Sequence, residues 1–208
     1  MTKIKFCGLS RRCDIEAVNE LKPEYIGFVF VKTSKRYVSF EKAEELKSLL
    51  DPKIKAVGVF VNEDKDVITM YADRFGLEYI QLHGKESPEY CQSLRTSGLK
   101  IIKAFSVARP KDLNHVSEYE KTCNLFLFDT KCEQYGGSGN QFDWNILHTY
   151  NGQVPFLLSG GINSHSANAL KAFNHPRLAG YDLNSRFELK PGEKDPERIR
   201  MFLNELKS

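Results

Sequence analysis

The sequence contains no long apolar run and no cysteine pair at metal-ligand spacing. Without a stretch of about 18 apolar residues, no membrane-spanning helix is expected, and the first 20 residues lack the apolar core of a signal peptide. None of the five cysteines forms a C-x-x-C motif, which argues against structural zinc sites and thioredoxin-like redox motifs. An odd number of cysteines without paired spacing is typical of the reducing cytoplasm, so we expect a cytoplasmic protein.

Strong charge of either sign is also missing. The 30 basic and 27 acidic residues are interspersed, and the net charge of +3 is too small to suggest a nucleic-acid partner. The glycine-rich segment from Gly136 to Gly139 lacks the Gly-Lys-Ser/Thr ending of a phosphate-binding P-loop, so nucleotide hydrolysis is not indicated. We expect this segment to be a mobile lid beside a site.

What the chain does contain is a regular alternation of strand and helix patterns. Eight such units fill 208 residues, a length near the lower limit for one (β/α)₈ barrel, and 41% hydrophobic residues suffice for a sizeable core. The short connections predict parallel strands with right-handed crossovers. We therefore predict an α/β fold, a single (β/α)₈ TIM barrel that spans residues 1–208 as one domain.

Period-two alternation defines the strands, and caps or helix-forming residues define the helices. The expected strands are 3–8, 25–30, 55–61, 79–83, 100–107, 125–130, 154–159 and 178–183. The expected helices are 11–21, 40–50, 64–75, one that opens at Ser87, 110–121, a short one from about Trp144, 163–173, and one that opens at Asp195 and runs to about Leu206.

The first strand carries a cysteine at its end. Ile4 and Phe6 point to one side, whereas Lys5 and Cys7 point to the other, which is the lumen of a barrel. Cys7 then lies just before Gly8 at the C-terminal mouth, where barrel enzymes keep their catalytic residues. A free cysteine is more often a small buried residue, so Cys7 alone does not establish a site.

Other polar residues recur toward the strand ends on the side we assign to the lumen. These residues are Gln81, His83, Lys103, Asp129 and Asp182. Each has an ordinary explanation: an aspartate can cap a loop, a histidine can be hydrogen-bonded in the core, and the two lysines, Lys5 and Lys103, can fill the lumen and pair with the acids. Their convergence on one mouth favours a functional site.

Two further features could bind anionic groups. Gly160 and Gly161 follow the seventh strand and precede a helix, where bare backbone N–H groups favour a phosphate, although two glycines can equally form a tight turn. Arg36 lies in a polar loop after the second strand. Such arginines are usually solvated, but this loop also borders the mouth.

The order and spacing of these residues resemble the phosphoribosylanthranilate isomerase family, the tryptophan-pathway barrel, over essentially the whole length. The matching segments are Lys5-Phe6-Cys7-Gly8 with Ser10, Ser34 to Val38, Gln81 to Gly84, Phe128 to Thr130, Gly136 to Gly139 followed by Phe142 to Trp144, Leu158 to Ile162, and Asp182 to Ser185 with Glu188 and Pro191 to Asp195.

The resemblance implies an Amadori rearrangement of N-(5′-phosphoribosyl)anthranilate to 1-(2-carboxyphenylamino)-1-deoxyribulose 5-phosphate. By this resemblance Asp129 is the general acid and Cys7 the general base. Neither a metal nor an organic cofactor is expected, because the iminium intermediate itself accepts the electrons. The expected partner is the small phosphoribosyl substrate, with no nucleic acid and no membrane, and the protein is expected to be a monomer or a homodimer.

The resemblance also assigns the residues that bind the substrate. Arg36 holds the anthranilate carboxylate, Asp182 bonds sugar hydroxyls, and His83 lines the site. The phosphate contacts are Gly160, Gly161 and Ser185. One departure concerns Arg186, which stands where many family members have a glycine.

Two other readings remain open on the sequence. Another phosphosugar barrel is one: a metal-dependent epimerase would need more ligands than His83, and the histidine-pathway isomerase would have an aspartate where this chain has Cys7. A barrel that has lost catalysis and only binds phosphate is the other. The presence of both Cys7 and Asp129 argues against it.

Overall fold

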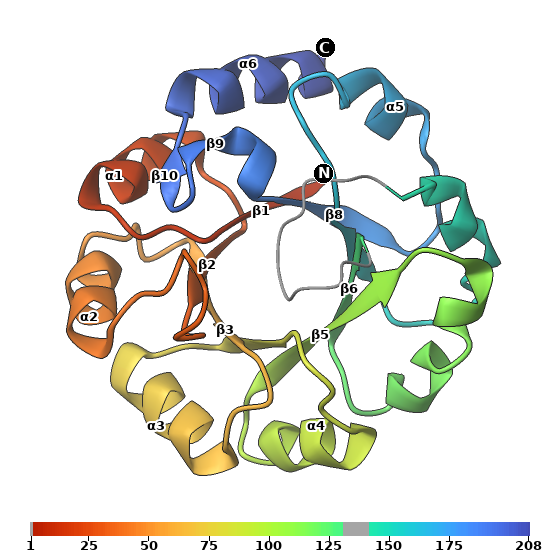
Figure 1. The fold of residues 1–208 in the computed structure, drawn as a ribbon, viewed down its shortest axis with the longest axis horizontal. Coiled ribbons are helices and arrows are strands. Elements are labelled where there is room, and N and C mark those ends of the chain that lie inside the picture. Colours follow the sequence, from red (N-terminus) through yellow and green to blue (C-terminus); the bar gives the residue numbers. More distant parts are fainter. Residues whose placement is uncertain (1, 131–141) are drawn as a thin grey trace.

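Eight parallel strands form a closed barrel, and the helices lie outside it as a ring (Figure 1). The computed structural model describes residues 2–130 and 142–208. The strands pair in sequence order, and β8 returns to β1 to close the barrel. The barrel strands are β1 Lys3–Cys7, β2 Tyr25–Val29, β3 Lys55–Phe60, β4 Tyr79–Leu82, β5 Lys100–Val107, β6 Leu125–Thr130, β7 Phe156–Leu158 and β8 Leu178–Leu183. The predicted fold class is confirmed.

Alternation along the strands separates two apolar regions. Side chains on the inner face fill the lumen mainly toward the strand starts, and this cluster comprises Tyr25, Val57, Ile102, Ala104, Leu125, Leu127 and Leu157. Side chains on the outer face, such as Phe6, Ile80 and Phe128, pack with the helices in the main core. Because the start of the lumen is filled with apolar groups, the polar residues gather toward the strand ends, at the mouth.

Most helices begin at capping residues of the expected kind. Ser87 and Asp195 each accept a hydrogen bond from a backbone N–H in the first turn, and a proline follows each of them. The α-helices are α1 Arg12–Leu21, α2 Phe40–Ser48, α3 Lys65–Phe75, α4 Pro88–Arg95, α5 Ala167–Ala172 and α6 Pro196–Lys207. No helix in the described ranges is long and apolar enough to cross a bilayer.

Two of the predicted helices were wrong in extent. The segment 110–121 forms two short 3₁₀ helices, η1 Pro110–Leu113 and η2 Val116–Tyr119, because Asn114 and His115 between them are weak helix formers. The helix expected over 163–173 begins only at Ala167. Asn163 and Ser166 form a hydrogen-bonded turn before it, in which the Asn163 backbone N–H donates to the Ser166 hydroxyl and the Ser166 backbone N–H donates to the Asn163 carbonyl. The short helix from Trp144 is the 3₁₀ helix η3 Trp144–Thr149.

A small hairpin after β8 was not predicted. It consists of β9 Glu188–Lys190 and β10 Glu193–Lys194, and it follows the 3₁₀ helix η4 Ser185–Phe187. Gly192 takes a positive φ of 83° in its turn, and its carbonyl accepts a hydrogen bond of 2.7 Å from the Ser10 hydroxyl. The backbone N–H of Lys194 donates to Asp14 of α1. These contacts fix the hairpin beside the loop that follows β1.

Candidate active site

The barrel seam carries a buried ion pair at the mouth. Lys5 and Asp182 are register partners on β1 and β8, and the Lys5 ammonium lies 2.8 Å from Asp182 Oδ1. The Ser159 hydroxyl, after β7, donates to Asp182 Oδ2 at 3.1 Å. Burial alone would lower the pKa of Lys5, but Asp182 and Cys7 outweigh it and raise that pKa. Lys5 thus pairs with an acid, as its ordinary explanation in the sequence allowed.

Cys7 lies next to this pair and is buried, with 4% of its surface exposed. Burial raises the pKa of its thiol, and Asp182 adds to this. Lys5 acts in the opposite direction through its charge and a hydrogen bond, and so does the charge of Lys194. The thiolate is therefore disfavoured by desolvation and supported by two lysines.

Gly27 on β2 provides the space for the thiol. It is the register partner of Cys7, and a Cβ at this position would lie 2.8 Å from Cys7 Sγ and 3.2 Å from Lys5 Nζ. Sequence reasoning did not identify Gly27, because its function is the absence of a side chain on the inner face.

Asp129 and His83 come together across the mouth from β6 and the end of β4. His83 Nε2 lies 3.6 Å from Asp129 Oδ2, and the Thr130 backbone N–H donates to Asp129 Oδ1 at 2.8 Å. Burial raises the pKa of Asp129 and lowers the pKa of His83. Both shifts favour the neutral forms, a carboxylic acid and a neutral imidazole.

Arg36 forms a bidentate ion pair with Glu188 of the hairpin. Arg36 Nη2 lies 2.6 Å from Glu188 Oε2, and Nε lies 2.9 Å from Oε1. The same carboxylate accepts from Lys194 Nζ at 2.8 Å. Burial would raise the pKa of Glu188, but hydrogen bonds and charges from Arg36 and Lys194 hold it below its ordinary value. One carboxylate therefore lies between two cations, which leaves an excess positive charge.

The stem of Arg36 crosses the loop that follows Cys7. Gly8 has a positive φ of 77°, and a Cβ there would lie 2.5 Å from Arg36 Cδ. A glycine is thus required both by backbone conformation and by the close approach of the arginine. This contact brings the predicted carboxylate-binding residue next to the predicted base.

The expected phosphate end lies where β7 and its neighbour β8 finish. Gly160 and Gly161 have positive φ angles of 82° and 71°, and a Cβ at Gly160 would lie 2.4 Å from Thr130 Oγ1. Ser185 begins η4, and only Asn184 separates it from the end of β8. The Arg186 side chain is exposed, and its carbonyl accepts a 3.3 Å hydrogen bond from Arg198. The two turns predicted to bind phosphate therefore follow adjacent strands.

One predicted lumen residue was wrong. Lys103 points away from the lumen, because its neighbours Ile102 and Ala104 occupy the inner face of β5. Its ammonium lies 3.2 Å from Glu86 and bonds the carbonyls of Leu82 and Gly84. Lys103 thus holds the loop after β4 and does not line the site. The predicted lid, Gly136 to Gly139, lies outside the described residues.

Three polar or charged residues of the site received no role from the sequence: Ser159, Glu188 and Lys194. In the sequence, Glu188 and Lys194 were noted only because they lie in segments that resemble the family. The ion pair between them depends on the hairpin, which the sequence did not predict. Within residues 2–130 and 142–208, no group of three or more His, Cys, Asp or Glu side chains could hold a metal ion.

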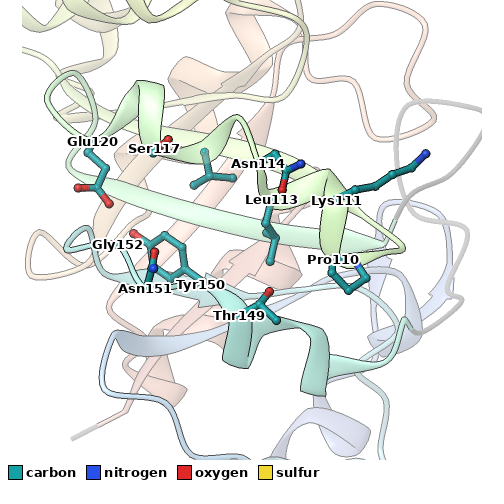
Figure 2. A pocket seen from close by; sticks show the side chains of 11 residues that line it. Pro110, Lys111, Leu113, Asn114, Ser117, Glu120, Thr149, Tyr150, Asn151 and Gly152 are labelled. Carbon is teal, nitrogen blue, oxygen red and sulfur yellow. The ribbon is translucent and has the colours of Figure 1, made fainter.

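A pocket on the outside of the barrel is separate from this mouth. Figure 2 shows it beside η1, η2 and the segment 149–152. Its volume is about 440 Å³. Its lining contains none of the predicted site residues; it consists of Pro110, Lys111, Leu113, Asn114, Val116, Ser117, Glu120, Thr149, Tyr150, Asn151 and Gly152. We assign it no part in the chemistry.

Comparison with known proteins identifies the family. The model of the family described as N-(5′-phosphoribosyl)anthranilate (PRA) isomerase matches residues 4–205. The chain belongs to the PRA isomerase family. The isomerase of Phocaeicola vulgatus is 45% identical over 204 residues, covering 98% of this chain and 97% of the relative. That of Parabacteroides distasonis is 46% identical over 206 residues, covering 98% and 92%.

Solved structures of PRA isomerases have the same fold. That of the Thermotoga maritima enzyme has a TM-score of 0.87 and 34% identity, and covers 100% of this chain and 99% of that one. A PRA isomerase in complex with reduced 1-(o-carboxyphenylamino)-1-deoxyribulose 5-phosphate has a TM-score of 0.85 and 31% identity with the same coverage. A third structure shows monomers generated from the dimeric T. maritima enzyme, with a TM-score of 0.84, 31% identity and the same coverage.

The space beside Cys7 can be tested by substitution of Gly27. Gly27→Ala would place a methyl group 2.8 Å from the thiol, so we expect the sulfur to shift and kcat to fall roughly tenfold to a hundredfold. Gly58→Ala on β3 is the matched control, since its Cβ would meet Leu77 and Phe60 at the same 2.8 Å but on the outer face. Overpacking should cost both variants about 1–3 kcal/mol. Equal kcat in the two variants would contradict a special role of Gly27.

Proposed function

We propose that the chain catalyses the Amadori rearrangement for which its family is named, in tryptophan biosynthesis, with Asp129 as the acid and Cys7 as the base. The observation that carries the assignment is that Cys7 ends β1 and Asp129 is the penultimate residue of β6, both on the inner face at the mouth. Cys7 is buried and Asp129 is partly buried, and each lies beside a partner that modifies its pKa. General acid and base catalysis requires groups held within reach of different atoms of one substrate.

Asp129 acts first. Its raised pKa favours the protonated carboxyl, which gives its proton to the ring oxygen of the ribose. The bond between C1′ and the ring oxygen then breaks, the anthranilate nitrogen supplies its lone pair, and an iminium forms at C1′. Asp129 is left as a carboxylate, and the backbone N–H of Thr130 stabilises that charge.

Cys7 acts on the iminium. Its thiolate takes the proton from C2′, the electrons of that C–H bond form a C1′–C2′ double bond, and the nitrogen regains its lone pair. The resulting enol tautomerises to the ketone product. Lys5 and Lys194 favour the thiolate that this step needs, against the effect of burial.

The ends of the substrate are held by opposite parts of the mouth. Arg36 binds the anthranilate carboxylate, helped by the excess positive charge of the Arg36–Glu188–Lys194 cluster. Gly160, Gly161 and Ser185 bind the phosphate, while His83 and Asp182 line the sugar between them. Residues 1–208 act as one domain in the cytoplasm, as a monomer or homodimer, and the phosphoribosyl compound is the ligand.

Kinetics of two variants test the acid and the base. The wild-type chain should isomerise the substrate in the presence of a chelator. Cys7→Ser replaces the thiol by a far weaker acid, and Asp129→Asn removes the proton donor, so each should lose nearly all kcat while the reduced product analogue still binds. If Cys7→Ser keeps more than roughly a tenth of kcat, a barrier change below about 1.4 kcal/mol, Cys7 is not the base.

The same Asp129→Asn variant should be more stable than the wild type above acid pH. A carboxyl whose folded pKa is raised binds more protons in the folded state, so the wild type loses stability as the pH rises from about 4 through the raised value. Asn cannot titrate and can still accept from Thr130. The stability difference in urea should therefore be small below pH 4 and grow with pH. A variant less stable at neutral pH would contradict the raised pKa.

Arg36 can be tested through KM. Arg36→Ala should lose one charge-assisted contact worth about 1.5–3 kcal/mol, which is roughly tenfold to a hundredfold in kcat/KM, carried mainly by KM. Arg36→Lys should recover only part, because an ammonium cannot form the bidentate pair with Glu188 and also a substrate contact. Arg200→Ala, which removes an exposed pair with Glu20, is the control. Unchanged KM and kcat in Arg36→Ala would place Arg36 outside the site.

A further inference from the structure

Gln81 has a polar atom in the lumen that nothing in the mechanism uses. Its side chain is 1% exposed, and its register partners are Val59 on β3 and Ile102 on β5, which point inward. The amide nitrogen Nε2 lies 3.0 Å from His83 Nδ1. The amide oxygen Oε1 is buried and has no hydrogen-bond partner in the structure's described part.

The contact with His83 determines where the imidazole carries its proton. An amide nitrogen can only donate, so Nδ1 of His83 accepts and the proton of the neutral ring lies on Nε2. That N–H faces Asp129 Oδ2 at 3.6 Å. The arrangement is a chain of three side chains, Gln81 to His83 to Asp129.

We infer that Gln81 is a further residue of the isomerase site: its amide nitrogen holds His83 in the Nε2–H form toward Asp129, and its amide oxygen accepts a hydrogen bond from a sugar hydroxyl of the substrate. The inference rests on the proposed function, since it takes Asp129 as the acid and a phosphoribosyl compound as the ligand.

The tautomer matters because Asp129 must keep its proton for the substrate. With the proton on Nδ1, the lone pair of Nε2 would face the Asp129 carboxyl and compete for that proton. With the proton on Nε2, the ring has no lone pair on that side and can only donate. Gln81 therefore acts on the acid through His83, as a positioning residue.

The surroundings of His83 keep the ring neutral. Asp129 from β6 and Asp182 from β8 favour the charged imidazolium, whereas Lys103 from β5 and Lys5 from β1 oppose it. Burial is the largest effect and favours the neutral ring. A neutral histidine has one donor and one acceptor, so the Gln81 contact is enough to fix its orientation.

The unpaired amide oxygen of Gln81 indicates that the ligand supplies a hydrogen-bond donor. A buried carbonyl oxygen without a donor is uncommon in proteins. The two nearby ammonium groups are committed elsewhere: Lys5 to Asp182, and Lys103 to Glu86 and backbone carbonyls outside the lumen. Hydroxyls of a ribosyl substrate are donors of the right kind, and the lumen is where that substrate is held.

The ¹⁵N spectrum of the five histidines in the ligand-free protein tests the positioning of His83 by Gln81 without any activity assay. The His83 signals are assigned by their loss in His83→Asn. We expect a protonated Nε2 and an unprotonated Nδ1 at neutral pH. A protonated Nδ1 in the wild type would overturn the positioning role, whatever the outcome for the isomerase reaction.

Variants of Gln81 test both the positioning of His83 and the contact with the substrate. Gln81→Met is similar in volume but has no hydrogen-bonding group, so we expect a mixture of the two His83 tautomers, a lower kcat, and roughly twofold to tenfold weaker binding of reduced 1-(o-carboxyphenylamino)-1-deoxyribulose 5-phosphate. Unchanged tautomers and kcat would overturn the positioning role. Unchanged affinity for that analogue would overturn the contact with the substrate.

Gln81→Glu with a matched control separates the tautomer from general effects. A carboxylate at 81 accepts, so it should move the proton to Nδ1 or charge the ring and lower kcat more than Gln81→Met does. Gln92→Glu makes the same chemical change on the exposed face of α4 and should leave the His83 signals and kcat unchanged. A Gln81→Glu variant with wild-type signals and kcat would contradict the inference.

Discussion

The closure of the barrel between β1 and β8 is the constraint on which the site depends. It places Lys5 beside Asp182, although 177 positions separate them in the chain. A buried ion pair carries a large desolvation penalty, which good geometry and further hydrogen bonds must offset. Ser159 supplies such a bond from β7. Cys7 lies two residues beyond Lys5 on the same face of β1. Its position and the cation beside it therefore depend on the pairing of β1 with β8.

Burial then acts on the proposed acid and base in the same direction, with opposite consequences. It raises the pKa of Asp129, which suits a proton donor, and it raises the pKa of Cys7, which opposes a proton acceptor. The charges of Lys5 and Lys194 partly correct the second effect. Two lysines therefore act on Cys7, whereas Asp129 faces the neutral imidazole of His83.

Alternation along the strands was enough to predict the barrel and the inward direction of Cys7, Asp129 and Asp182. It failed for Lys103, because period two gives two faces but does not say which one is inside. Small and branched apolar residues fill a lumen as readily as they fill an outer core, and Ile102 and Ala104 do so here. Glu188 could not be assigned from sequence, since its contacts with Arg36 and Lys194 exist only once the hairpin has formed.

A crystal structure of this chain with reduced 1-(o-carboxyphenylamino)-1-deoxyribulose 5-phosphate bound tests the roles of Cys7 and Asp129 most directly. We expect Cys7 Sγ to lie in contact with C2′, at about 3.5–4 Å, and Asp129 to lie within about 2.6–3.2 Å of the oxygen derived from the ribose ring. If Cys7 is more than about 5 Å from C2′ and another basic group lies there, the assignment of the base is contradicted.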